Sequence, residues 1–127
     1  MLEKKKKILI VDDDSFLLDM YSLKFNQKGF EVYSASSGKE ALEKLHSGIN
    51  PDVILMDIIM PEMTGFEMLQ KINEEKLSEN SVKIILSNKG QQSDIDMGES
   101  LGAVGYIVKA NSTPTEVLEK VGEILAR

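Results

Sequence analysis

Near the middle of the chain, four consecutive apolar residues run directly into an acid: Val53-Ile54-Leu55-Met56-Asp57. Continuous apolarity, rather than alternation of apolar and polar residues, is typical of a strand that is covered on both faces, as strands are in a parallel sheet. The sequence therefore predicts a buried strand over 53–56, with the carboxylate of Asp57 at its carboxyl end.

Similar short runs, rich in β-branched residues, occur elsewhere in the chain, at 8–11, 31–35, 83–86 and 106–108. The stretches between them carry helix-start signals, namely the capping-box pairs Ser37/Glu40, Thr64/Glu67 and Thr113/Glu116. Strands that alternate with helices need crossover connections, and right-handed crossovers place helices on both faces of the sheet. The pattern thus predicts an α/β protein with a doubly wound, five-stranded parallel sheet.

Size and composition limit the possible functions. The 127 residues make one domain, 1–127, and 42 % of them are hydrophobic, which is enough for a folded core. There is no cysteine, which excludes disulfides and thiolate metal sites. A net charge of −6 argues against direct binding to nucleic acid. The sequence ends just after the last predicted helix, so we expect no output domain within it.

The cellular setting follows from two further features of the sequence. No apolar stretch approaches the ~18 residues of a membrane span, so we expect no membrane contact. The first residues are basic but lack both the long apolar region and the cleavage site of a signal peptide. We therefore expect a cytoplasmic location.

Polar and charged side chains follow four of the five predicted strands. Acids end the first strand (Asp12, Asp13) and the third (Asp57), and an ammonium, Lys109, ends the fifth. In an open parallel sheet the binding crevice lies beyond these carboxyl ends. Crowded carboxylates raise one another's pKa unless a cation neutralises them, and Mg²⁺ is a hard cation that prefers oxygen ligands. The sequence therefore predicts a magnesium site at this edge.

The same residues make Asp57 a candidate nucleophile, because a carboxylate can attack phosphorus and form an aspartyl phosphate. Lys109 would then pair with the phosphoryl group. Ser87, at the end of the fourth strand, would donate a hydrogen bond to a phosphoryl oxygen that exists only after the modification. Such a differential contact can shift a conformational equilibrium.

Five segments in this order, spread over essentially the whole chain, are similar to the receiver domain of bacterial response regulators, in particular the single-domain chemotaxis type. They are Val11-Asp12-Asp13-Asp14, Leu55-Met56-Asp57-Ile58-Ile59-Met60-Pro61, Gly65, Leu86-Ser87 and Gly102-Ala103-Val104-Gly105-Tyr106-Ile107-Val108-Lys109. The resemblance implies a flavodoxin-like (βα)5 fold with strand order 2-1-3-4-5. It also implies transfer of a phosphoryl group to Asp57 from a sensor histidine kinase or a phosphotransfer protein. The domain would catalyse its own phosphorylation and slow dephosphorylation rather than act as a turnover enzyme.

The resemblance also assigns roles to single residues. It implies Mg²⁺ bound by Asp13, Asp57 and the backbone carbonyl of Ile59, with Asp12 contributing through water. Ser87, the backbone of Asn88 and Lys109 would bind the phosphoryl group. Ser87 and Tyr106 would form a switch that changes the face of the fourth helix, fifth strand and fifth helix. An unknown downstream protein, or a second copy in a homodimer, would dock on that face.

Two positions depart from the family pattern. Most members follow the lysine with proline, whereas Lys109 precedes Ala110. Because a cis bond costs ~2.5–4 kcal/mol before a residue other than proline, we expect this peptide bond to be trans. The second departure is Asn88, where the family prefers a small residue. Its bulk is expected to narrow access to Asp57 and slow phosphorylation.

Two other functions compete with this interpretation. Haloacid-dehalogenase-like hydrolases also use a nucleophilic aspartate, but they place a second acid two residues later, where this chain has Ile59. The other alternative is a degenerate receiver that acts as a phosphate-independent interaction module. The complete set of site positions argues against it, while Asn88 and Ala110 keep it open.

Asp14 is interpreted as the cap of the first helix, and the methionines around Asp57 as core residues.

Overall fold

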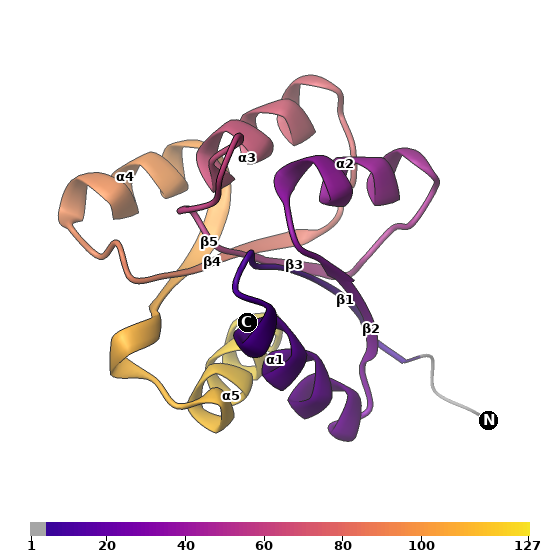
Figure 1. Ribbon diagram of the computed structural model, residues 1–127, viewed down its shortest axis with the longest axis vertical. Helices are drawn as coiled ribbons and strands as arrows, with labels where there is room; N and C mark the ends of the chain where they lie inside the picture. Colours follow the sequence, from indigo (N-terminus) through magenta and orange to yellow (C-terminus); the bar gives the residue numbers. More distant parts are fainter. Residues whose placement is uncertain (1–4) are drawn as a thin grey trace.

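The computed structural model describes residues 5–127 and contains the expected alternation of strands and helices (Figure 1). The strands are β1 Lys7–Val11, β2 Glu31–Ala35, β3 Val53–Met56, β4 Val82–Ser87 and β5 Ala103–Val108. The helices are α1 Ser15–Gln27, α2 Gly38–His46, α3 Gly65–Glu74, α4 Gln92–Ser100 and α5 Pro114–Leu125, with a 3₁₀ turn, η1, at Lys109–Asn111. Among these helices, none combines the length and apolarity needed to cross a membrane.

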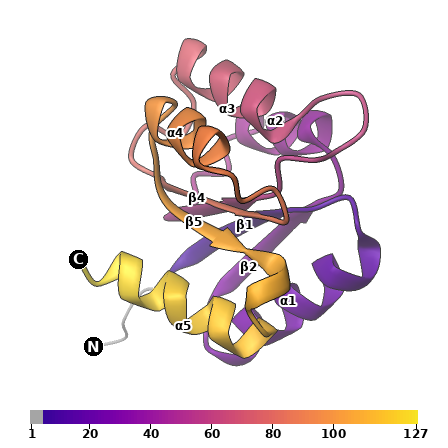
Figure 2. The ribbon, with the colours of Figure 1, turned by 90° about the vertical axis from the view of Figure 1, so that its left-hand side faces the viewer.

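The five strands form one parallel sheet in the order β2-β1-β3-β4-β5, which confirms the predicted doubly wound fold. Helices α1 and α5 cover one face, and α2, α3 and α4 cover the other (Figure 1). Seen from the side, the sheet lies between these two helical layers (Figure 2). This arrangement explains why the central strand β3 is apolar along its whole length: both of its faces are buried.

The two faces carry separate hydrophobic clusters. The cluster under α2, α3 and α4 contains Met56, Met60 and Met68, which confirms the core role of these methionines, and Met63 packs against it half-buried. The cluster under α1 and α5 contains Phe25 and the inner side chains of α5. Residues adjacent along β3 alternate between the two clusters, so this strand anchors both halves of the core.

Local signals set most helix starts. Asp14 caps α1 by accepting the Leu17 N–H, as predicted, and Thr64 and Thr113 form complete capping boxes at α3 and α5. At α2 only half of the predicted box forms. Ser37 accepts the Glu40 N–H, but the Glu40 carboxylate instead accepts hydrogen bonds from Ser36. The Ser36 N–H and hydroxyl both donate to the same oxygen of that carboxylate, at 3.2 and 2.8 Å.

The largest difference from the predicted strand boundaries is in β5, since β1 and β4 differ by only one residue at an end. Strand β5 begins at Ala103, three residues before the apolar run that was expected to define it. The early part was hidden because Gly105, which has no side chain, separates Ala103 and Val104 from the apolar run that follows. The pairing of β4 with β5 also contains a register shift between Lys83 and Ile84.

Gly65, at the start of α3, lets the chain pass close behind the end of β3. Its N–H donates to the Ile58 carbonyl at 2.8 Å. A Cβ at this position would lie 2.1 Å from the Asp57 carbonyl oxygen and 2.8 Å from Ile58 Cα. Because both obstacles are backbone atoms, no side chain can move aside to make room. Glycine is therefore required where α3 meets the loop after β3.

We expect Gly65→Ala to lower the free energy of unfolding by about 2–3 kcal/mol, because the new methyl group overlaps backbone that carries Asp57. Urea denaturation followed by far-UV circular dichroism measures the change. The matched control is Gly122→Ala in α5, where a Cβ would meet nothing within 4 Å. That variant should be more stable by about 0.5–1 kcal/mol. Equal stability of the Gly65→Ala variant and the wild type would contradict the steric argument.

Candidate functional site

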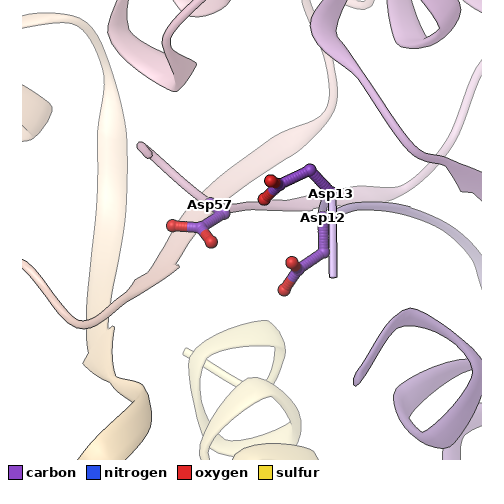
Figure 3. Close-up of side chains that lie close together, drawn as sticks. All are labelled: Asp12, Asp13 and Asp57. Atoms are coloured by element: carbon purple, nitrogen blue, oxygen red, sulfur yellow. The ribbon is translucent and has the colours of Figure 1, made fainter. Parts of the chain in front are cut away.

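Three carboxylates meet at the carboxyl edge of the sheet. Val11 and Met56 are paired in register, so the residues that follow them, Asp12 and Asp57, emerge side by side from β1 and β3. The Asp57 N–H donates to the Val11 carbonyl at 3.0 Å, which continues this pairing one step further. Figure 3 shows both side chains with Asp13, and one oxygen of each carboxylate lies within 4.8 Å of the others.

Lys109 reaches this group from the end of β5. Its Nζ lies 2.7 Å from Asp12 Oδ2 and 2.7 Å from Asp57 Oδ2. Both acids are nearly inaccessible, at 2 % and 7 % relative exposure. The predicted convergence of Asp12, Asp13, Asp57 and Lys109 is therefore present among the described residues, where the Lys109 ammonium contacts two of the three acids.

Burial and pairing act in opposite directions on the titration of this group. Burial raises the pKa of Asp12 above its ordinary value, even though hydrogen bonds from Lys109 and the Asp14 N–H oppose the change. For Lys109, burial alone would lower the pKa, but its hydrogen bonds to Asp12 and Asp57 outweigh burial and raise it. Lys109 consequently stays charged, and the negative charge of Asp12 is only partly compensated.

The loop after β3 holds the Asp57 carboxylate in a fixed orientation. Its Oδ1 accepts the N–H groups of Ile58 at 2.7 Å and Ile59 at 3.2 Å, while Oδ2 accepts from Lys109. These two loop amides were not anticipated from the sequence, since backbone donors leave no residue signal. The carboxylate faces a cavity of about 300 Å³, whose walls include Leu17, Asn88 and the side chain of Ile59.

The donor set fits a hard divalent cation. All three side chains offer carboxylate oxygens, the type of ligand that Mg²⁺ prefers, and Asp13 is exposed, which leaves room for retained waters. A cation would also compensate the charge that Lys109 leaves unbalanced. The role of the Ile59 carbonyl as a further ligand stays a prediction.

Ser87 and Tyr106, the two residues predicted to form a switch, are both hydrogen-bonded to the backbone of Lys89. Ser87 is fully buried at the end of β4, between the strands that carry Asp57 and Lys109, and its Oγ accepts the Lys89 N–H at 3.3 Å. The Tyr106 hydroxyl donates to the Lys89 carbonyl. Burial, with smaller effects from Asp94 and Asp57, raises the pKa of Tyr106 to about 12, so this hydroxyl keeps its proton.

The two departures noted in the sequence are joined by one hydrogen bond. The Asn88 side-chain oxygen accepts the Ala110 N–H at 2.9 Å. Within residues 5–127 every peptide bond is trans, so the expected trans geometry of the Lys109–Ala110 bond is confirmed. This contact between residues 22 positions apart was not predicted from the sequence. One sequence signal could have revealed this hydrogen bond. Relative to the family pattern of a small residue and a proline, the chain has both a side-chain acceptor at Asn88 and a backbone donor at Ala110.

Comparison with known proteins agrees with this architecture. Residues 8–121 match the model of the response regulator receiver domain family. The chain is 34 % identical over 122 residues to the alkaline phosphatase synthesis transcriptional regulatory protein PhoP of Bacillus subtilis, covering 96 % of this chain and 49 % of that protein. It is 33 % identical over 120 residues to the response regulator SaeR of Staphylococcus aureus, covering 94 % and 50 %. The chain thus spans about half the length of the curated relatives it matches.

Solved structures extend the agreement to three dimensions. A CheY-like receiver domain protein from Methanospirillum hungatei superposes with a TM-score of 0.86 at 32 % identity, covering 97 % of this chain and 95 % of that one. The chemotaxis response regulator CheY4 of Vibrio cholerae gives a TM-score of 0.86 at 30 % identity, covering 95 % and 99 %. On these grounds the chain belongs to the response regulator receiver domain family of two-component systems.

Proposed function

We propose that this chain is a phospho-acceptor signalling domain that takes a phosphoryl group onto Asp57 from a sensor histidine kinase or a phosphotransfer protein. The observation that carries the proposal is the position of the Asp57 carboxylate. It lies at the floor of a cavity, held by two loop amides on one oxygen and by Lys109 on the other. We expect the reaction to take place in the cytoplasm, where phosphodonors derived from ATP are available.

In the proposed reaction, a carboxylate oxygen of Asp57 attacks the phosphorus of a phosphohistidine. The new O–P bond forms as the N–P bond to the imidazole breaks. Lys109 supports this transfer because its ammonium already lies 2.7 Å from the acceptor carboxylate. An ion pair at ~4 Å with an effective dielectric constant near 20 gains about 4 kcal/mol before desolvation is subtracted, so its charge can stabilise the incoming phosphoryl oxygens.

Asp12, Asp13 and Asp57 are the residues that would hold Mg²⁺, together with the Ile59 carbonyl. When bound, the cation supplies positive charge beside the acceptor and the phosphoryl oxygens. The protein contributes a rigid acceptor, because the Asp57 oxygens are oriented before the donor arrives.

The output is proposed to pass through Ser87 and Tyr106. After phosphorylation, the Ser87 hydroxyl would donate to a phosphoryl oxygen, and a movement of its Oγ toward that oxygen would change the long contact in which it now accepts the Lys89 N–H. A movement of Lys89 would reach Tyr106 through the carbonyl that its hydroxyl contacts. The affected face, α4-β5-α5, exposes the apolar side chains Met97 and Val104, which favours docking of a downstream protein or a second copy of the chain.

We expect the wild-type chain to gain the mass of one phosphoryl group when incubated with acetyl phosphate and Mg²⁺. Intact mass spectrometry measures the adduct. Asp57→Asn should abolish it, and chelation of the metal should reduce it at least tenfold. Asp19→Asn, at an exposed acid of α1, is the matched control and should keep the full adduct. No adduct on the wild type would favour a phosphate-independent interaction module, and rapid multiple turnover would favour a hydrolase.

A second prediction concerns the charge on Asp12. Because its pKa is raised, the folded state binds this proton more tightly than the unfolded state does. The free energy of unfolding therefore falls as the pH rises from the ordinary aspartate pKa through the raised value. Asp12→Asn carries no charge to be lost as the pH rises and should therefore make the metal-free protein more stable than the wild type at pH 7. Urea denaturation at pH 7 in the presence of a chelator measures the difference.

The same variant tests the metal site. Because Mg²⁺ binds the folded state, it should raise the free energy of unfolding of the wild type as its concentration increases. The rise should be several-fold smaller for the Asp12→Asn variant. The Asp19→Asn control should respond to Mg²⁺ as the wild type does. If Mg²⁺ stabilises all three proteins equally, Asp12 does not belong to a magnesium site.

A further inference from the structure

The side chain of Asn88 joins two loops at the edge of the site. The last registered pair of the β4–β5 ladder is Ser87 with Val108, so Asn88 and Lys109 stand one step beyond the end of the ladder. At this point the Asn88 Oδ1 accepts the Ala110 N–H at 2.9 Å. A side-chain hydrogen bond thus continues the connection between the strands after their backbone pairing has ended.

The Ala110 N–H needs this acceptor because of its position in η1. The first N–H groups of a helical turn have no partner inside the turn, and Val108, which precedes η1, makes no side-chain cap. Proline at 110 would have no N–H to donate. A small residue at 88 would have no acceptor that reaches this far. The contact therefore depends on both departures from the family pattern at once.

The hydrogen bond between Asn88 and Ala110 lies next to Lys109, the residue whose ammonium pairs with the buried acids of the site. Ala110 directly follows Lys109, whose ammonium reaches Asp12 and Asp57. A lysine side chain has a flexible four-carbon stem, so the position of its ammonium depends on how firmly its backbone is held. Ala110 is small and exposed and offers little packing to hold the turn. Asn88 and Lys109 also both line the cavity over Asp57 and a neighbouring one of about 320 Å³.

From these observations we propose that Asn88 is a positioning residue for Lys109. Its side-chain oxygen fixes the start of η1 through the Ala110 N–H, and this holds the Lys109 ammonium between Asp12 and Asp57. The link replaces, by a tertiary hydrogen bond, the rigidity that a proline ring would give the turn. The kinetic part of the proposal rests on the proposed phosphorylation of Asp57, whereas the contact itself can be tested without it.

This positioning role and simple obstruction of the cavity by the Asn88 side chain predict opposite changes in the phosphorylation rate of the Asn88→Ala variant. If Asn88 only narrowed the entrance, Asn88→Ala would speed phosphorylation, and Asn88→Leu, which has the same branched shape but is larger, would leave it unchanged or slow it. If Asn88 holds the turn, both variants lose the acceptor and both slow the reaction. Asn88→Asp keeps an oxygen in the same place and should preserve the contact with Ala110.

The experiment measures, for each variant, hydrogen exchange of the Ala110 amide by NMR and the rate of Asp57 phosphorylation by acetyl phosphate with saturating Mg²⁺. We expect Asn88→Leu and Asn88→Ala to exchange the Ala110 proton at least tenfold faster. Both should lower the maximal rate of phosphorylation about three- to tenfold and change the acetyl phosphate concentration at half-maximal rate by less than twofold. Asn88→Asp should retain Ala110 protection. Asn26→Leu, at an exposed asparagine of α1, should match the wild type in both measurements.

Several results would overturn the proposal. Unchanged Ala110 exchange in Asn88→Leu would show that the hydrogen bond does not hold the turn. Faster exchange with an unaltered maximal rate would show that the turn does not position Lys109. A faster reaction in Asn88→Ala alone would assign the effect to bulk. If the wild type takes no phosphoryl group, the proposed function fails separately. Exchange of the Lys109 ammonium protons, which should be faster in Asn88→Leu, then decides the positioning role.

Discussion

The contact of one ammonium with two buried carboxylates is the constraint around which this end of the molecule is built. Lys109 reaches Asp12 and Asp57 at 2.7 Å each and so ties together the ends of β1, β3 and β5. Burying an acid without a partner is costly, and a single lysine cannot balance three acids. The site is thus left with an excess of negative charge that favours a cation, and with a positive group poised for a phosphoryl oxygen.

The sheet makes this contact possible through its register. Asp12 and Asp57 are neighbours because β1 and β3 pair in parallel and end together, so neither side chain has to reach for the other. Gly65 allows α3 to start directly behind Asp57, which keeps the loop short and its amides directed at the carboxylate. Apolar strands, a close helix start and an acidic edge are therefore parts of one arrangement, in which the core fixes the geometry of the site.

Features that arise from local physics could be predicted from the sequence. Strand β3 is apolar because both its faces are covered, and Asp14 caps α1 through a residue only three positions away. The contact of Asn88 with Ala110 joins residues 22 positions apart and depends on where the β4–β5 ladder ends, which residue types do not encode. The same limit applies to the start of β5, where Gly105 interrupts the apolar pattern, and to the Glu40 carboxylate, which had two possible partners within reach.

Lys89 illustrates a division between backbone and side chain. The Ser87 and Tyr106 hydroxyls both contact the peptide groups of this residue, while its own exposed ammonium lies 3.8 Å from the largely buried carboxylate of Asp94. The internal linkage therefore needs only the peptide groups of residue 89, which every amino acid except proline supplies. The side chain at this position can therefore change during evolution and alter the surface that other molecules meet. The contacts of Ser87 and Tyr106 with the backbone of residue 89 would remain.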